Sequence, residues 1–484
     1  MLLAGIASLA LVVSVAAAGP RRAEERPDLE TALNREVRHA AHVSRRLGVA
    51  VHRLEDGAEI YAYHPDRLLI PASNVKLFTT AAALHELGPG YFFTTRVYQR
   101  GPVVAGVLHG DLAVVGGGDP TISGREYYGD SFAVFRQWAA ALKKEGVQEI
   151  AGDVQLVTGF FEPRMVHPDW PEDQRAHWYE APVSALALDD NCFMVRVEPG
   201  ARPGARGWVE IEPRIPGFFQ LSNRLRTSRS RRAQRVNIVR PAAGREVEVS
   251  GRLWVGAGDS EQWVAVNDPI TYFGAGLREA LRQEGIEIKG EPRAVRRLEG
   301  PEWKLLTEHR TDLVTVIDVT NKHSQNFFAE STLKTLGAER CGEGSWRAGL
   351  KAVAEFLTRV GIPAGSYNQA DGSGMSRNNR FSPDQVIRLL RYMYFHRYGK
   401  VFMRSLPYGG EEDLHWKERL ADSPYRGNVL AKTGTLDGVS ALSGYVKARS
   451  GTLYVFSIIG NRTRANYLEK DAEDGIVRAL IDHG

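Results

Sequence analysis

The chain has 484 residues, which at about 100–200 residues per domain allows two to four domains. Hydrophobic residues make up 43% of the chain and charged residues 25%, a composition that excludes collagen-like, coiled-coil and disordered classes. The 62 basic and 58 acidic residues leave a net charge of +4, which is too small to indicate a nucleic-acid partner, and none is expected.

The N-terminus has the composition of a secretory signal. An apolar run that begins at Met1 is followed by three alanines at residues 16–18, which match an Ala-x-Ala cleavage site. The run is shorter than the roughly 20 residues that span a bilayer. No basic residue precedes it, so a buried N-terminal helix is the alternative. We expect residues 1–18 to be a signal peptide that directs export to the periplasm or cell envelope.

The next segments predict a helix, a hairpin and a second helix. Apolar residues at helical spacing between Leu29 and Leu47 predict a helix over residues 27–46. Strands are predicted at 48–52 and 59–63, joined by a turn at Asp56-Gly57. Pro71 then opens a helix over residues 73–87, which the Gly-Pro-Gly of residues 88–90 ends.

From about residue 95 to 303 the pattern changes to short strands separated by glycines. Two similar units, residues 132–152 and 272–290, each read as a helix, a glycine, a strand and a glycine. We expect an inserted α/β domain at 95–195 and 257–303, and within it an inserted β-rich domain at 196–256. Seven arginines between Arg224 and Arg240 predict either contact with an anionic polymer or surface, or simply a solvated β-surface.

The C-terminal part predicts helices and then a second set of strands, at 428–431, 441–448 and 452–460, with a final helix over 465–481. Because both ends of the chain carry strands and helices, residues 25–94 and 304–484 are expected to form one catalytic domain. Cys192 and Cys341 are the two cysteines; a disulfide is one alternative, but they fall in different expected domains, which favours two unpaired thiols.

Ser73-Asn74-Val75-Lys76 supplies a nucleophile and a base for acyl transfer. Residues three apart share a helix face, so the Lys76 amine can reach the Ser73 hydroxyl. Burial would lower the pKa of the lysine enough to make it a base. A chain of this length contains such a motif about once or twice by chance. A second copy, Ser331–Lys334, lies inside a predicted helix and is set aside.

Two further motifs complete a site. Ser324-Gln325-Asn326 follows a polar break between predicted helices at 313–319 and 327–336, and a loop there can present Ser324 and Asn326 to a cleft. Copies of this motif begin at Ser366 and Ser376. Lys432-Thr433-Gly434-Thr435 is expected about 0.1 times by chance. A strand edge with these residues suits a substrate carboxylate and an extended peptide.

In this order the motifs resemble those of the penicillin-interacting serine enzymes. The chain is most similar to the D-alanyl-D-alanine carboxypeptidase/endopeptidase family of the penicillin-binding protein 4 type, peptidase family S13. The resemblance extends over nearly all of the chain. Further runs carry it: residues 116–121 (GGGDPT), 152–154 (GDV), 181–186 (APVSAL), Asn191, 371–378 (DGSGMSRN) and 382–383 (SP). The 251 residues between Ser73 and Ser324 match the branch with large insertions.

The resemblance implies an α/β (α+β) fold of the serine β-lactamase/DD-peptidase type, with an antiparallel sheet flanked by helices, an α-helical subdomain and the inserted domains. It implies that Ser73 attacks the bond between two D-alanines of a peptidoglycan peptide, and that Lys76 takes the proton. Ser324 would pass a proton toward the leaving amine, aided by Lys432 and Asn326.

The same resemblance implies that the backbone N–H groups of Ser73 and Thr435 hold the oxyanion, and that Thr433, Gly434 and Thr435 bind substrate. Penicillin and other β-lactams would acylate Ser73, and neither metal nor organic cofactor is needed. One residue departs from the family: Val157 occupies the matching position of an aspartate thought to meet a charged substrate side chain.

Three alternatives follow from the same residues. A β-lactamase would need a glutamate for its deacylating water, and no Glu-x-x-Leu-Asn run lies between the first two motifs. A Ser-His-Asp hydrolase would need a Gly-x-Ser-x-Gly elbow, which residues 372–374 do not provide. A non-catalytic penicillin-binding wall protein of the same fold would lack turnover, although all the catalytic side chains are present.

Overall fold

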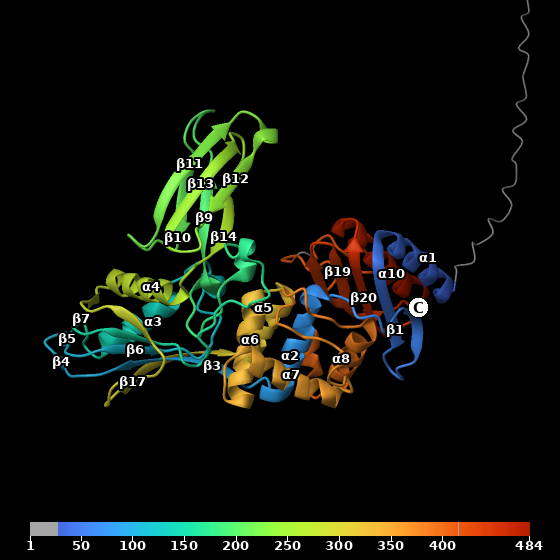
Figure 1. Ribbon diagram of the computed structural model, residues 1–484, viewed down its shortest axis with the longest axis horizontal. Helices are drawn as coiled ribbons and strands as arrows, with labels where there is room; N and C mark the ends of the chain where they lie inside the picture. The colour runs from blue at the N-terminus through green and yellow to red at the C-terminus, as the bar shows by residue number, and fades with distance from the viewer. Residues whose placement is uncertain (1–27, 415) are drawn as a thin grey trace, which may run out of the picture.

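The computed structural model describes residues 28–414 and 416–484, so the predicted signal peptide lies outside the described residues. A helical and sheet-containing part built from both ends of the chain lies beside a smaller α/β part, from which a β-rich arm projects (Figure 1). Among the described residues, no helix is both long and apolar enough to cross a membrane.

The largest antiparallel sheet combines strands from both ends of the chain, in the order β18-β19-β20-β1-β2. Because β1 pairs with β20 along its whole length, the N-terminal hairpin is fixed to the C-terminal strands. The edge of β18 that faces away from β19 borders the site described below. The strands are β1 (Ser44–Arg53), β2 (Glu59–Tyr63), β18 (Val429–Leu436), β19 (Val439–Lys447) and β20 (Leu453–Thr463).

Helices cover both faces of this sheet and enclose two hydrophobic cores. α1 and α10 pack together on one face, where Leu33 and Val37 of α1 are buried. α2 lies among α5, α6 and α7 on the other side, and α8 packs against β1 and β20. The helices are α1 (Leu29–Val43), α2 (Val75–Leu87), α5 (Leu313–Lys322), α6 (Asn326–Cys341), α7 (Trp346–Val360), α8 (Pro383–Phe395), α9 (Gly399–Arg404) and α10 (Asn466–His483).

Residues between α2 and α5 build the α/β part and the arm. The two similar helix–strand units lie side by side, because β7 pairs with β15 and β8 pairs with β16, both in parallel. The sheet orders are β16-β8-β6-β3-β17 and β15-β7-β5-β4. The elements are β3 (Phe92–Gln99), β4 (Val103–Val104), β5 (Val107–Leu108), β6 (Leu112–Val115), α3 (Ala133–Lys144), β7 (Glu149–Ile150), β8 (Val154–Val157), α4 (Pro269–Gln283), β15 (Glu287–Ile288), β16 (Pro292–Val295) and β17 (Lys304–Asp312).

The projecting arm consists of two three-stranded sheets, β10-β9-β14 and β11-β13-β12. Leu225, Val249 and Leu253 form the apolar side of the second sheet, and its other side faces solvent. Its strands are β9 (Cys192–Glu198), β10 (Trp208–Glu212), β11 (Gln220–Ser228), β12 (Arg235–Val239), β13 (Glu246–Trp254) and β14 (Ser260–Ala265). Cys192 and Cys341 are both free thiols.

Two predicted helix boundaries are wrong. The first helix ends at Val43, and Leu47, which was counted on its apolar face, lies in β1. The pattern misled because β1 continues directly from the helix with buried residues at similar spacing. The helix predicted to begin at Ser73 starts instead with a 3-10 turn at Ala72–Asn74, and α2 proper begins at Val75. The residue before Ser73, Ala72, has a left-handed φ of +46°, so regular α-helix cannot extend back through it.

Candidate active site

Ser73 and Lys76 lie at the start of the buried helix α2, one turn apart. The Lys76 side chain is fully buried, and its Nζ is 3.1 Å from Ser73 Oγ. It also lies 2.6 Å from Asn326 Oδ1 and 2.7 Å from the Ser373 carbonyl oxygen. Burial lowers the pKa of Lys76 to about 7, while the nearby carboxylates of Glu330 and Asp371 act in the opposite direction.

These three contacts orient the Lys76 amine. A neutral amine has two N–H donors and one lone pair. Asn326 Oδ1 and the Ser373 carbonyl oxygen are both acceptors, so they take the two N–H groups. The lone pair is then directed at Ser73, which can donate its hydroxyl proton to it. The geometry therefore suits proton abstraction from Ser73 at near-neutral pH.

Ser324 and Asn326 lie at the short turn between α5 and α6, on the opposite side of the cleft from β18. Ser324 has a left-handed φ of +57°, which a non-glycine residue adopts at a cost of about 1–2 kcal/mol. The Lys432 Nζ donates to Ser324 Oγ at 2.9 Å, and Asn326 Nδ2 donates to the Tyr179 carbonyl oxygen at 2.9 Å. This turn is thus held from both the sheet and the inserted part.

Residues 432–435 lie on β18, the edge strand of the main sheet. Lys432 is buried, and burial together with the positive charge of Lys76 lowers its pKa well below the usual value. A Cβ on Gly434 would lie 2.5 Å from the Pro71 carbonyl oxygen, so only glycine lets β18 come this close to the nucleophile turn. Thr433 and Thr435 line the cleft beside Ser73.

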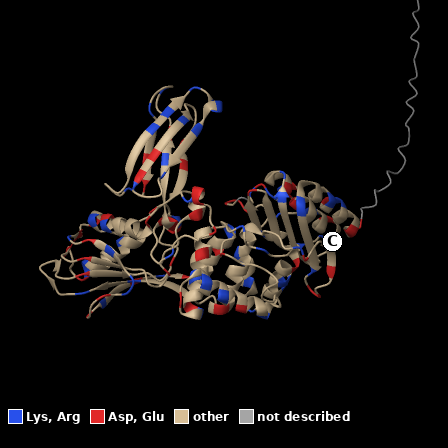
Figure 2. Ribbon diagram, viewed as in Figure 1, with Lys and Arg blue, Asp and Glu red and all other residues tan. Residues whose placement is uncertain are grey.

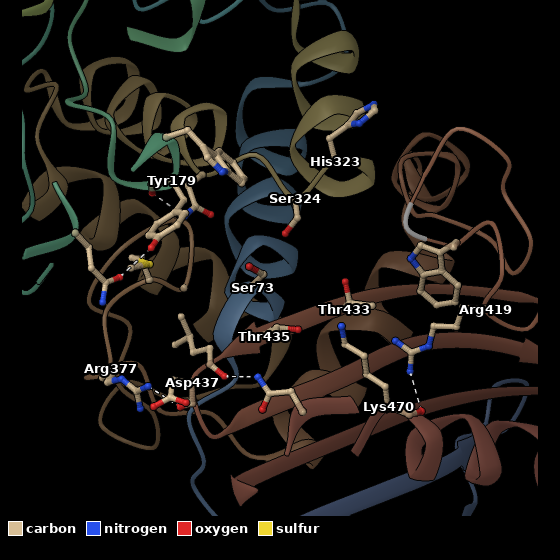
Figure 3. A pocket seen from close by; sticks show the side chains of 18 of the residues that line it. Ser73, Tyr179, His323, Ser324, Arg377, Arg419, Thr433, Thr435, Asp437 and Lys470 are labelled. Atoms are coloured by element: carbon tan, nitrogen blue, oxygen red, sulfur yellow. Dashed lines mark hydrogen bonds between the residues drawn. The ribbon is translucent and has the colours of Figure 1, made fainter. Parts of the chain in front are cut away.

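The side chains converge on a cleft of about 1050 Å³ between the helices, the sheet and the inserted part. Figure 3 shows Ser73 and Ser324 pointing toward one another, with Thr433 and Thr435 below them on β18. Arg377 and Asp437 lie at one end of this cleft and Arg419 at the other. The Arg419 charge is neutralised by ion pairs of 2.6 Å with Glu473 and 2.7 Å with Asp474.

A buried carboxylate network holds the backbone that contacts Lys76. Glu330 accepts hydrogen bonds from the N–H groups of Gly372 and Ser373 and from the indole of Trp346. Asp371 accepts hydrogen bonds from the backbone N–H groups of Gly374 and Ser376. It also accepts from the side chains of Trp170 and Asn379, which are both buried. Burial, aided by the charge of Asp371, raises the pKa of Glu330 to about 7.

The predicted site residues come together. Of the chance copies of the motifs, the one that begins at Ser376 reaches the edge of the cleft through Arg377, without contacting Ser73 or Lys76. Ser73, Lys76, Ser324, Asn326 and Lys432 are linked by the contacts above, and Thr433 to Thr435 follow on β18. The second Ser-x-x-Lys copy lies inside α6, where Lys334 Nζ is 3.5 Å from the centre of the Trp346 ring. Val157 is buried in β8 and is not one of the residues that line the cleft.

Three residues near the site were not found from the sequence. Asp169 lines the cleft and accepts hydrogen bonds from Ser376 and Asn378. Glu330 lies inside an apolar helix pattern that carried no catalytic signal. Asp190 contacts Gln325 from the inserted part, 135 residues away in sequence. The DGSGMSRN run was noted from the family resemblance, but its hydrogen-bonding role became visible only in three dimensions.

No three His, Cys, Asp or Glu side chains gather as a metal site would in the part of the chain that the structure describes. The side chains at the site provide a serine beside a lysine, a second serine–lysine pair, and an edge strand that borders the cleft. Fold and site together are those of the serine acyl-transfer enzymes.

Comparison with known proteins identifies the family within that class. The model of the D-Ala-D-Ala carboxypeptidase 3 (S13) family matches residues 29–482, and the chain belongs to this family. The D-alanyl-D-alanine carboxypeptidase of Actinomadura sp. (strain R39) is 34% identical over 463 residues, covering 92% of this chain and 82% of the relative.

Two further comparisons agree. The D-alanyl-D-alanine carboxypeptidase DacB of Haemophilus influenzae is 26% identical over 414 residues, which cover 85% of this chain and 84% of the relative. The crystal structure of penicillin binding protein 4 from the same organism has a TM-score of 0.79 and 25% identity, and covers 93% of this chain and 98% of that one. The protein is accordingly a serine-type D-Ala-D-Ala carboxypeptidase.

Proposed function

We propose that Ser73 is the nucleophile and that Lys76 is its general base. The observation that carries this proposal is the placement of Lys76 Nζ, 3.1 Å from Ser73 Oγ with both of its N–H groups directed at other acceptors. Lys76 takes the hydroxyl proton as Ser73 Oγ attacks the carbonyl carbon between two D-alanines. A tetrahedral intermediate forms, with its negative charge on the former carbonyl oxygen.

The oxyanion is bound by the backbone N–H groups of Ser73 and Thr435. The C–N bond then breaks, and the leaving amine receives a proton through the hydroxyl of Ser324. Lys432, which donates to Ser324 Oγ at 2.9 Å, stabilises that hydroxyl as it gives up its proton. Water then attacks the acyl-enzyme, and release of the shortened peptide regenerates Ser73.

The substrates proposed are peptidoglycan peptides that end in D-Ala-D-Ala. An extended peptide can lie along the free edge of β18 by forming strand-type hydrogen bonds. Its terminal carboxylate meets the hydroxyls of Thr433 and Thr435 beside Lys432. An endopeptidase activity on crosslinked peptides would use the same residues, because the leaving group is again an amine on a D-amino acid.

β-Lactams are proposed to acylate Ser73 by the same route. The structure of the Haemophilus influenzae relative complexed with a β-lactam, which is 25% identical with a TM-score of 0.75, supports this proposal. Residues 1–18 are proposed to be a signal peptide, and the mature enzyme to work in the periplasm or cell envelope. We also propose that the division into a catalytic domain built from both ends of the chain, an inserted α/β domain and an inserted β-rich domain is the functional one.

The experiment measures the release of D-alanine from a peptide that ends in L-Lys-D-Ala-D-Ala. It compares the wild type with the variants Ser73→Ala and Lys76→Arg. Arginine keeps the positive charge but cannot deprotonate in proteins. Both variants should lose at least about 1000-fold in kcat/KM. Activity within tenfold of the wild type for Lys76→Arg would overturn the assignment of the base.

A further inference from the structure

Four arginines form a row across the outer sheet of the projecting arm. Arg226 on β11 lies opposite Arg252 on β13, and Arg252 lies opposite Arg235 on β12. A separate bridge places Arg206 opposite Arg226 on the other side. Residues that are directly opposite in a sheet point to the same face, so the four side chains share one exposed surface. Neighbouring strands are about 4.8 Å apart, and the row therefore spans roughly 14 Å.

In the described part of the chain, none of the four arginines in the row forms an ion pair with a carboxylate within 4 Å. Arg224, on the same strand as Arg226, differs because it contacts Glu248 at 3.6 Å. The polar contacts of the row are with neutral groups. Arg235 Nε donates to Asn237 Oδ1 at 3.2 Å, and Arg206 donates to the Asn223 carbonyl oxygen. Like charges placed opposite each other destabilise a sheet, and a bound anion would remove that repulsion.

The positive charge is concentrated at the outer end of the arm. Blue segments lie side by side across the far end of β11, β13 and β12, whereas red segments lie nearer the base (Figure 2). The loop after β11 adds Arg229, Arg231 and Arg232. A cavity of about 380 Å³ opens between these groups, lined by Gly204, Arg226, Thr227, Ser228, Arg229 and Arg252.

The chemistry of the side chains indicates the kind of ligand. The chain has no lysine between Lys144 and Lys289, so every basic group of the arm is a guanidinium. Guanidinium groups bind phosphate and carboxylate through two parallel N–H donors. A row of such groups, flanked by an arginine-lined cavity, fits several anionic groups repeated along one chain better than it fits a single small anion.

A flat anionic membrane is less suited to this surface. Insertion into a bilayer interface needs exposed apolar or aromatic anchors. The outermost loop, residues 229–233, has the sequence RSRRA and contains none. The nearby Trp254 is half-buried, with the Arg231 guanidinium 5.9 Å from its ring centre.

We propose that this surface, defined by Arg206, Arg226, Arg235 and Arg252, binds a linear polyanion with repeating phosphate or carboxylate groups. The arm projects away from the part of the molecule that contains α2 and the main sheet (Figure 1). The active-site cleft therefore stays open while the arm is bound. This surface gives the enzyme an attachment site that is independent of its catalytic residues.

The test measures binding of the full chain to fluorescently labelled linear polyphosphate over a series of salt concentrations. The row variant carries Arg226→Gln, Arg235→Gln and Arg252→Gln. The control variant removes the same charge elsewhere, with Arg35→Gln, Arg38→Gln and Arg45→Gln, three exposed positions on α1 and β1. D-Alanine release from a soluble peptide should be equal in all three proteins, because none of these residues contacts the cleft.

The row variant should bind polyphosphate at least about tenfold more weakly. The slope of log binding constant against log salt concentration should become shallower by about two to three, because fewer counterions are released on binding. The control variant should stay within about twofold of the wild type. Equal weakening in both variants would show that net charge alone is responsible and would overturn the proposal. So would binding to phosphatidylglycerol vesicles without binding to polyphosphate, or unchanged binding by the row variant.

Discussion

Asp190 accepts a 2.7 Å hydrogen bond from the side-chain amide of Gln325, the central residue of the turn that carries Ser324 and Asn326. The same carboxylate oxygen accepts from Arg125 at 2.8 Å. Asp190 is buried and belongs to the inserted part of the chain, whereas Gln325 belongs to the part with the nucleophile. The insertion therefore contributes directly to the position of a motif whose central residue lies 135 residues further along the chain.

Replacing Asp190 by alanine should reduce kcat/KM for D-alanine release about tenfold. The change leaves the Gln325 amide without its acceptor and Arg125 without its ion pair, which together destabilise the fold by about 2 kcal/mol. Ser324 keeps its left-handed φ only while its surroundings hold it, so the turn should relax. Kinetics and thermal unfolding of the variant measure both effects.

The control for this prediction is Asp130→Ala. Asp130 also forms a 2.8 Å ion pair with an arginine, Arg136, in the inserted part, but it does not contact the turn. Asp190→Asn keeps an oxygen that can accept from Gln325, and it should recover most of the activity. If Asp130→Ala and Asp190→Ala lower kcat/KM equally, Asp190 has no specific role in positioning Ser324.

The pH dependence of kcat/KM should follow the ionisation of Lys76. The base must be neutral to accept the Ser73 proton, and burial lowers its pKa to about 7. Activity should therefore rise with pH, with a midpoint near 7, and level off above about pH 8. A midpoint near 10, the usual value for an exposed lysine, would contradict this assignment.

Glu330→Gln should move that midpoint to lower pH. The Glu330 carboxylate favours the protonated form of Lys76, so removing its charge lowers the pKa of the lysine. The variant should also lose about 1–3 kcal/mol of stability, because an amide group cannot accept from both Trp346 and the backbone N–H groups. A midpoint that is unchanged, or that moves to higher pH, would show that Glu330 does not influence Lys76 electrostatically.

Gly374→Ala should abolish acylation. Gly374 has a φ of +89°, and a Cβ there would lie 1.9 Å from the Ala72 carbonyl oxygen and 3.0 Å from the Ser73 nitrogen. The nucleophile turn would have to shift, at a cost of about 3 kcal/mol. Gly365→Ala is the matched control, with a φ of +84° and no atom within 4 Å of its Cβ. It should lose about 1–2 kcal/mol of stability from backbone strain and keep its activity.

The residues that the sequence proposed as reacting groups lie together in the structure because each motif is local. Ser73 and Lys76 are one helical turn apart, and Lys432 to Thr435 precede a turn, so short motifs place each group correctly. The groups that support them depend on long-range packing. Asp190 and Glu330 look like ordinary charged residues in the sequence, and only the fold places one against Gln325 and the other against the Gly372–Ser373 backbone.

The strained backbone conformations near the site could not be predicted from the sequence either. The sequence gives no sign that Ala72 and Ser324 adopt a left-handed φ, because both residue types normally avoid it. The 3-10 turn at Ala72–Asn74, which contains Ser73, packs against β18. The Val157 position shows the limit of matching by family pattern: Val157 is buried in β8 and does not line the cleft, whereas Asp169, which the sequence did not single out, does.

The most direct test of the central claim is to locate the covalent adduct that a fluorescent penicillin forms. The wild type should gain one adduct, and mass spectrometry should place it on the peptide that contains Ser73. Ser331→Ala, in the second Ser-x-x-Lys copy, should label like the wild type, and Ser73→Ala should not label. An adduct on any other residue, or labelling of a folded Ser73→Ala variant, would contradict the account.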